Sequence, residues 1–210
     1  MARGSGETIE ERLARMTRIE RPLWAAGARV AGIDEVGRGS LAGPVVAACV
    51  VMPSCRLVPG VDDSKKLSEA KRESLYDILI ERAEYVRTGW VEPGRIDSVN
   101  ILAATRIAME DAARGATGAH FLVDAVTSLA LPGGSTAIIH GDALSYSIAA
   151  ASIIAKVERD RYMAALHERY PQYRFDRNKG YGTKEHIEAI LLFGPCPAHR
   201  RTFISKWVSA

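Results

Sequence analysis

Four acidic residues, Asp34, Glu35, Asp124 and Asp142, stand at the ends of short apolar runs in this sequence. The first two are adjacent and follow ARVAGI, while the others follow HFLV and IIHG. Buried carboxylates are costly, so strand-end acids that converge usually bind cations or have shifted pKa values. Two Mg²⁺ ions about 4 Å apart can activate a water and stabilise the leaving oxygen of a phosphodiester. The four acids therefore suggest metal-assisted phosphoryl chemistry. The spacing alone does not show that they converge, and solvated strand-end acids are the alternative.

A glycine-rich turn follows the first two acids, in the segment GIDEVGRGSLAG over residues 32–43. Gly37, Gly39 and Ala42 match the G-x-G-x-x-G/A pattern of a dinucleotide-binding loop. Such a loop passes directly from a strand into a helix, so that the helix N-terminus faces the pyrophosphate. Here the strand-like run PVVAACVVM follows instead, and the two preceding carboxylates would repel a pyrophosphate. We therefore reject dinucleotide binding for this turn.

The elements that position these residues form an α/β pattern, which predicts a mixed central sheet flanked by helices. Apolar or alternating runs predict strands at 29–36, 44–52, 84–91, 120–126 and 136–140, with the first two joined as a hairpin. Amphipathic spacing and capping residues predict helices at 69–83, 96–114, 147–169 and 183–193. Residues 1–20 are expected to be a weakly anchored lead-in or a short charged helix. Asp160 is expected to form a surface pair with Lys156.

The composition is that of one globular domain. The chain has 210 residues, of which 47% are hydrophobic and 25% are charged. Its three cysteines form no paired motif, its charged N-terminus has no secretory apolar stretch, and no apolar run reaches membrane-spanning length. We therefore expect a soluble, cytoplasmic protein. The net charge is only +3, but residues 171–210 carry seven basic and three acidic side chains, which favours a polyanionic partner.

Beyond these patterns, the sequence resembles the ribonuclease HII family, the type 2 ribonucleases H. The matching motifs are AGIDEVGRGSLAGPVVAA (31–48), DDSKKLS (62–68), NILAATRIAM (100–109), LVDAV (122–126), GDALSYSIAAASIIAKVERD (141–160), and NKGYGTKEHIEAI with GPCPAHRRTF (178–203). The resemblance implies an RNase H-like fold with a mixed five-stranded sheet and a small helical C-terminal segment. It also implies metal-dependent cleavage, with Mg²⁺ or Mn²⁺, of the RNA strand of RNA–DNA hybrids. Cleavage 5′ of single ribonucleotides in duplex DNA, leaving a 3′-hydroxyl and a 5′-phosphate, is implied as well.

The same resemblance implies roles for individual residues. The catalytic and metal-binding quartet would be Asp34, Glu35, Asp124 and Asp142. The element Gly37, Arg38 and Gly39 would approach the minor groove and read the ribose 2′-hydroxyl, the group that distinguishes RNA from DNA. Tyr181 matches a tyrosine that packs on the sugar at the RNA–DNA junction, and Lys65 and Lys66 are candidates for phosphate contacts.

The chain departs from the family pattern at Ser40, Ala125 and His140, where proline, glycine and lysine are common. None of these changes removes a carboxylate. We expect one catalytic domain over 21–210, basic in its 170–210 segment, acting as a monomer on RNA–DNA hybrids and ribonucleotide-containing duplex DNA. The alternatives are a non-catalytic nucleic-acid-binding module and another nuclease of the same fold, such as an exonuclease or a resolvase.

Overall fold

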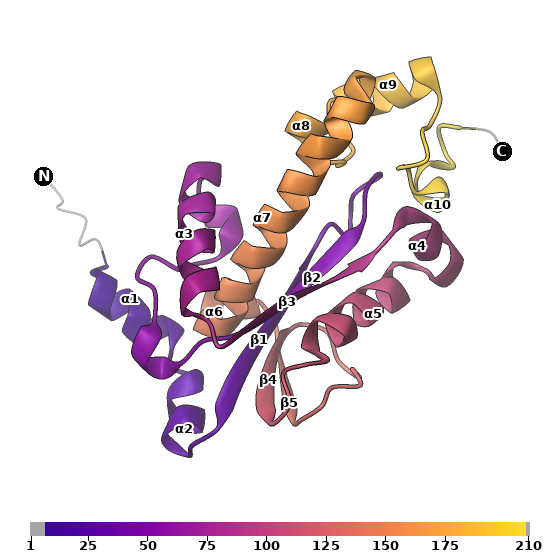
Figure 1. The fold of residues 1–210 in the computed structure, drawn as a ribbon. Coiled ribbons are helices and arrows are strands. Elements are labelled where there is room, and N and C mark those ends of the chain that lie inside the picture. The colour runs from indigo at the N-terminus through magenta and orange to yellow at the C-terminus, as the bar shows by residue number, and fades with distance from the viewer. Residues whose placement is uncertain (1–6, 209–210) are drawn as a thin grey trace, which may run out of the picture.

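A mixed five-stranded sheet forms the centre of the computed structural model, which describes residues 7–208 (Figure 1). Its strands are β1 (Arg29–Val36), β2 (Val45–Val51), β3 (Tyr85–Val91), β4 (Ala119–Asp124) and β5 (Ser135–Ile138), in the spatial order β3-β2-β1-β4-β5. β2 pairs antiparallel with both β1 and β3, whereas β4 pairs parallel with both β1 and β5. The predicted strands, the hairpin and the mixed sheet are confirmed.

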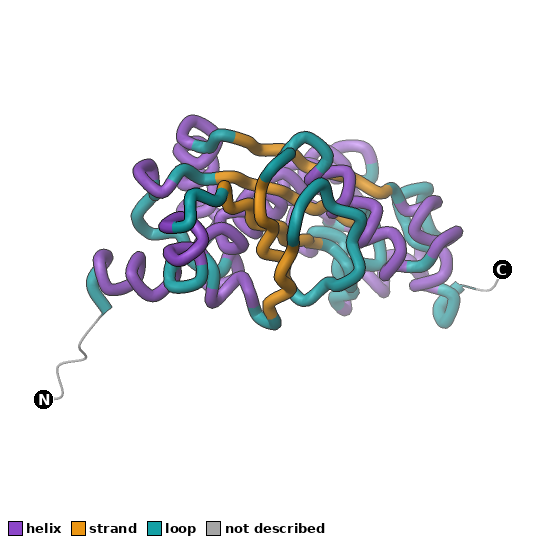
Figure 2. Tube along the Cα trace, turned by 90° about the horizontal axis from the view of Figure 1, so that it is seen from below, coloured by secondary structure: helices purple, strands orange, loops and turns teal. Residues whose placement is uncertain are grey.

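Helices cover both faces of the sheet. α7 (Tyr146–Arg169) and α3 (Glu69–Arg82) share a core with one face, and α5 (Ile101–Ala113) shares a core with the other. Viewed from below, the strands run through the middle of the molecule with helices around them (Figure 2). The apolar run of β2 is buried along its whole length because this strand has neighbours on both edges and helices on both faces.

The first half of α7 lies very close to β1. A Cβ on Gly32 would come within 2.0 Å of the backbone of Ser147, so only glycine fits at this crossing. The helix itself contributes small residues there, including Ala149 and Ala150, which are fully buried. Because Gly32 stands two residues before Asp34, this close packing fixes the strand that carries the first acids.

The predicted helix over 96–114 is wrong in detail, because two helices occupy that segment. α4 (Pro93–Val99) ends at Asn100, which has a φ of +70°, and α5 begins directly after it. The side-chain oxygen of Asn100 accepts hydrogen bonds from the backbone N–H groups of Leu102 and Ala103, at 3.0 and 3.1 Å. Asparagine is a strong helix N-cap, so the one residue that ends α4 also starts α5.

The N-terminal segment is anchored rather than loose. α1 (Ile9–Met16) places Met16 in the core, and α2 (Glu20–Ala25) places Glu20 in the interior. The Glu20 carboxylate accepts a hydrogen bond from the backbone N–H of Ser147 at 2.9 Å, at the start of α7. The short charged helix is confirmed as α1, the prediction of weak anchoring is wrong from Met16 to Glu20, and residues 1–6 lie outside the described residues.

Asp160 is also placed differently from its prediction. It pairs with Lys156 on α7 as expected, but it is only 5% exposed. The reason is α3, whose Arg72 reaches the same carboxylate at 3.7 Å. The carboxylate of this pair is therefore buried between two partly exposed cations, the second supplied by another helix.

The basic C-terminal segment folds around the far end of α7 (Figure 1). It consists of η3 (Pro171–Tyr173), α8 (Phe175–Asn178), α9 (Lys184–Phe193) and α10 (Arg201–Ile204). The predicted small helical C-terminal segment is thus confirmed. The remaining short elements are η1 (Ser54–Arg56), η2 (Ser64–Lys66) and α6 (Gly141–Leu144). Within residues 7–208, no helix is long and apolar enough to cross a membrane.

Candidate active site

Three carboxylates meet at one edge of the sheet. Asp34 and Glu35 lie near the end of β1, and Asp124 is the last residue of β4. These strands are parallel neighbours, with Ile33 opposite Val123, so their carboxyl ends bring the acids side by side. One carboxylate oxygen from each of the three lies within 4.8 Å of the others. The structure thus brings together three of the four acids that the sequence singled out.

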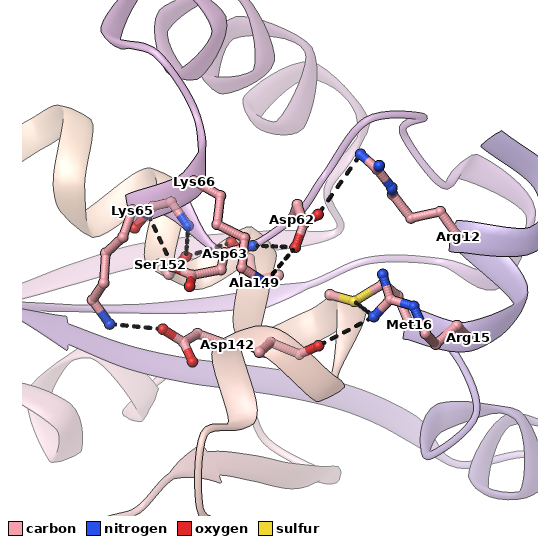
Figure 3. A network of polar contacts seen from close by, with 12 residues as sticks. Arg12, Arg15, Met16, Asp62, Asp63, Lys65, Lys66, Asp142, Ala149 and Ser152 are labelled. Atoms are coloured by element: carbon pink, nitrogen blue, oxygen red, sulfur yellow. Dashed lines mark hydrogen bonds and ion pairs between the residues drawn. The ribbon is translucent and has the colours of Figure 1, made fainter. Parts of the chain in front are cut away.

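Asp142 lies beside this group but on a different element, the first turn of α6. It is 4% exposed, and its Oδ2 accepts a hydrogen bond from Nζ of Lys65 at 2.8 Å (Figure 3). Lys65 comes from η2, so the fourth acid is held by a cation from a separate loop. The Nζ of Lys66 instead lies 3.6 Å from Asp62, and the structure places this lysine against that carboxylate.

Burial and mutual repulsion dominate the electrostatics of the three clustered acids. Burial, followed by the charges of Glu35 and Asp124, holds the pKa of Asp34 well above its usual value. Burial also raises the pKa of Glu35, although the guanidinium of Arg38, 3.2 Å from its Oε1, acts in the opposite direction. Burial likewise raises the pKa of Asp124, although the N–H of Gly141 donates to its Oδ1 at 2.7 Å. The contacts within the protein therefore do not compensate this concentration of negative charge.

This set of donors fits a hard divalent cation. Mg²⁺ and Mn²⁺ prefer carboxylate oxygens, and a cation would offset both the burial and the mutual repulsion that raise these pKa values. The Oε2 atom of Glu35 is buried and has no hydrogen-bond partner among the described residues. One ligand atom is therefore already free of competing contacts, next to Asp34 and Asp124.

The glycine turn after β1 is built against a buried arginine. Gly37 has a φ of +91°, and a Cβ there would lie 2.3 Å from Nε of Arg159. Glycine is thus required at position 37 by the interior of the protein, in addition to any contact with a substrate. Arg38 and Gly39 are exposed, and a Cβ on Gly39 would meet open space. Of the two glycines at positions 37 and 39, Gly39 is therefore the one that leaves room for another molecule to approach the backbone.

Two arginines that the sequence analysis did not single out hold this turn. Arg159, on α7, and Arg200, just before α10, are fully buried. Within the described part of the chain both donate only to backbone carbonyl oxygens, at 2.8–3.1 Å, namely those of Arg38, Ala42, Gly43, Pro44 and Lys179. Burial, and then the neighbouring charge of Arg159, lowers the pKa of Arg200 to about 9. No pattern in a single sequence distinguishes such arginines from those on the surface.

Tyr181 lies beside the same turn. The carbonyl oxygen of Gly180 accepts hydrogen bonds from the N–H groups of Leu41 and Ala42, at 2.8 and 3.2 Å. The Tyr181 side chain is exposed, and the guanidinium of Arg159 lies 5.6 Å from its ring centroid. Arg159 thus contacts both the glycine turn and the tyrosine, although more than 130 residues of sequence separate them.

The sheet order is that of an RNase H-like fold, and the acids at the ends of β1 and β4 form a candidate metal site in it. The family model described as Ribonuclease HII matches residues 31–206. Ribonuclease HII of Caldanaerobacter subterraneus subsp. tengcongensis is 49% identical over 199 residues, which cover 93% of this chain and 83% of the relative. Ribonuclease HII of Bacillus subtilis is 49% identical over 200 residues, which cover 94% of this chain and 78% of the relative.

A solved structure shows the same likeness. The ribonuclease H2 of Pyrococcus horikoshii superposes with a TM-score of 0.71 at 28% identity, covering 83% of this chain and 93% of that one. The chain belongs to the ribonuclease HII family, and it is therefore a hydrolase of the type 2 ribonuclease H class. The family and the fold class that the motifs predicted are both confirmed.

Proposed function

We propose that this chain is a divalent-metal-dependent endonuclease. It cleaves the RNA strand of RNA–DNA hybrids and cuts 5′ of single ribonucleotides in duplex DNA, leaving a 3′-hydroxyl and a 5′-phosphate. The observation that carries the proposal is the meeting of Asp34, Glu35 and Asp124 within 4.8 Å, beside an exposed turn. A protein that only binds nucleic acid gains nothing from such acids, because they repel phosphates. Membership of the ribonuclease HII family supports the same activity.

Asp34, Glu35 and Asp124 hold Mg²⁺ or Mn²⁺ in this proposal, and Asp142 completes the site from α6. When bound, such ions activate a water and stabilise the leaving oxygen of the phosphodiester. The chain contributes by keeping the carboxylates close together in advance, through the pairing of β1 with β4 and the N–H of Gly141. The Lys65 side chain is 76% exposed, so it is able to leave Asp142 for a substrate phosphate. Lys66 contacts phosphate beside it.

Substrate recognition in this proposal involves the glycine turn and Tyr181. The open face of Gly39 lets the backbone approach a ribose 2′-hydroxyl, and Gly37 and Arg38, the two residues before it, complete the same recognition element. The exposed ring of Tyr181 packs on the sugar at the RNA–DNA junction. The hydrogen bonds at Gly180 join these two parts into one surface. The exposed basic residues of 171–210, namely Arg177, Lys184, Arg201 and Lys206, add attraction for the nucleic-acid backbone.

The test uses end-labelled duplex DNA with one embedded ribonucleotide and, in parallel, a long RNA–DNA hybrid. Each is incubated with Mg²⁺, Mn²⁺ or EDTA. We expect a single cut 5′ of the ribonucleotide, which is lost in EDTA and in Asp34→Asn. Asp77→Asn, on the exposed side of α3, is the matched control and should cut like the wild type. Binding without cutting would favour a non-catalytic module, and dependence on a free end would favour an exonuclease of the same fold.

A second experiment addresses the tyrosine. Tyr181→Ala should slow cleavage at single ribonucleotides more than cleavage of long hybrids, because the sugar at the junction is the contact that is lost. Equal losses on the two substrates would make Tyr181 a structural residue only.

We also propose that the enzyme acts as a cytoplasmic monomer in ribonucleotide excision repair. Light scattering should give the mass of one chain, 22.8 kDa. A larger mass at working concentration would refute the monomer.

A further inference from the structure

A buried chain of polar side chains lies behind Tyr181, and the proposed reaction does not use it. His186 on α9 and His199 before α10 are at most 2% exposed. Nδ1 of His186 lies 2.9 Å from the carbonyl oxygen of Tyr181, and its Nε2 lies 3.0 Å from Nε2 of His199. Nδ1 of His199 lies 3.0 Å from the backbone nitrogen of Cys196, 3.2 Å from its Sγ and 3.3 Å from its carbonyl oxygen, so the N–H is the shortest of these contacts. Two imidazoles thus connect the loop after α9 to the backbone of the tyrosine.

These contacts determine which nitrogen of each ring carries a hydrogen. A carbonyl oxygen only accepts, so Nδ1 of His186 donates to Tyr181 and its Nε2 is left as an acceptor. His199 therefore donates from Nε2, and its Nδ1 accepts from the N–H of Cys196. In this pair of tautomers, a further proton on Nε2 of His186 would face the Nε2–H of His199, and one on Nδ1 of His199 would face the N–H of Cys196. Burial lowers the pKa of both histidines, in the case of His199 to about 4, which agrees with this arrangement.

Rigid neighbours hold the pair in place. Tyr173 packs edge-on against His199, with ring centroids 4.7 Å apart, and Phe175 packs edge-on against His186 at 5.4 Å. Arg200, the residue after His199, donates to two carbonyl oxygens of the glycine turn. One buried layer therefore fixes both the backbone of the tyrosine and the turn beside it.

We propose that His186 and His199 are positioning residues that orient Tyr181 on the sugar at the RNA–DNA junction. His186 fixes the Tyr181 carbonyl directly. His199 acts one step further away, because its Nε2–H keeps His186 in the tautomer that donates from Nδ1. This inference rests on the proposed function of Tyr181.

Two amide substitutions at His186 separate its two hydrogen bonds. Asparagine places its amide nitrogen where Nδ1 lies and keeps the donor to Tyr181, whereas glutamine places it where Nε2 lies and loses that donor. We expect His186→Gln to slow cleavage at single ribonucleotides about tenfold more than cleavage of long hybrids, because a small misplacement of a contact residue costs that much or more. His186→Asn should restore the wild-type preference. His120→Asn, a histidine on β4 bonded to Thr136, is the matched control.

A double-substitution cycle tests whether the histidine acts through the tyrosine. Adding His186→Gln to Tyr181→Ala should change the substrate preference no further, because the group being positioned is already gone. An additive loss, or an equal loss on both substrates, would overturn the inference and leave the histidines as packing residues. If Tyr181→Ala itself leaves the preference unchanged, the proposed function of Tyr181 fails, and this inference fails with it. If Tyr181→Ala changes the preference and His186→Gln does not, only the inference fails.

Long-range ¹H–¹⁵N NMR spectra of the wild-type protein test the tautomers directly. They require neither a cleavage assay nor a variant that folds correctly. We expect His186 to be protonated on Nδ1 and His199 on Nε2 near neutral pH. Any other pair of tautomers would overturn the inference whatever the kinetics show.

Discussion

Replacing Asp34 by asparagine should stabilise the metal-free protein while abolishing cleavage. Asparagine keeps the size of the side chain and the oxygen that accepts a hydrogen bond from the N–H of Glu35 at 2.8 Å. It removes one negative charge from three carboxylates whose oxygens lie within 4.8 Å of one another. At an effective dielectric constant of about 20, two unit charges 4.8 Å apart repel by about 3 kcal/mol. Partial protonation already relieves some of this repulsion, so the free energy of unfolding should rise by about 1–3 kcal/mol.

Thermal unfolding in EDTA measures this gain. In a domain of this size about 1 kcal/mol shifts Tm by about 2–4 °C, so Tm should rise by about 2–12 °C. The gain should increase with pH. Because the pKa of Asp34 is raised in the folded state, the folded wild type binds more protons than the unfolded chain, and it loses stability as pH rises through that pKa. Mg²⁺ should raise the Tm of the wild type and have much less effect on Asp34→Asn.

Asp77→Asn should leave both Tm and the response to Mg²⁺ unchanged. If Asp34→Asn is less stable than the wild type in EDTA, the three carboxylates do not repel one another in the folded state as argued. If Mg²⁺ stabilises the variant as much as the wild type, Asp34 is not a metal ligand.

Three further predictions concern the layer beneath the glycine turn. Gly37→Ala should lower the free energy of unfolding by about 1–3 kcal/mol, because the new Cβ would clash with Arg159 and because φ at this position is positive. Gly39→Ala is the control and should leave the free energy of unfolding unchanged. Equal urea midpoints for the two variants would contradict this reasoning. Arg200→Lys should cost about 2 kcal/mol, because a single ammonium does not reproduce the fork that binds two carbonyls; an unchanged urea midpoint would show that the fork is dispensable. The folded pKa of His199, about 4, lies below the usual 6.5, so the unfolded chain takes up this proton first and stability falls as pH drops from 6.5 towards 4. His199→Gln should flatten that slope relative to the wild type in urea unfolding at stepped pH, and identical slopes would mean that the histidine is not held neutral. The raised pKa of Asp34 gives the free energy of unfolding the opposite dependence on pH. This contribution is the same in the wild type and in His199→Gln, so it cancels when their slopes are compared.

The sequence by itself determined where most strands and helices lie and which acidic residues stand at the ends of strands. The run VVAACVV is short, apolar at every position and rich in β-branched residues, which favours a central strand covered on both faces, and β2 is that strand. The first half of α7 contains the small residues that allow a helix to lie on a sheet, and it lies on β1. Asp34, Glu35 and Asp124 could be singled out because each interrupts or ends an apolar run. These inferences succeeded because they depend on periodicity and composition over a few neighbouring residues.

Local patterns also misled at Asn100, because the apolar period continues through it. The spacing of apolar residues over 96–114 is compatible with one continuous helix, and it is not interrupted at the capping residue Asn100. Asparagine before an apolar run is a capping signal, so this boundary was within reach of the sequence.

Only the tertiary structure decided which distant groups meet. β1 and β4 are separated by about 80 residues of chain, and their parallel pairing, which no local pattern encodes, brings Asp34 and Asp124 together. The same holds for Lys65 on Asp142 and for Arg72 on the buried Asp160. Arg159 and Arg200 are the clearest cases. A guanidinium can be buried when carbonyl oxygens accept its hydrogen bonds, and here those oxygens come from segments far away in the chain. The acceptors of each arginine are therefore assembled only when the chain folds.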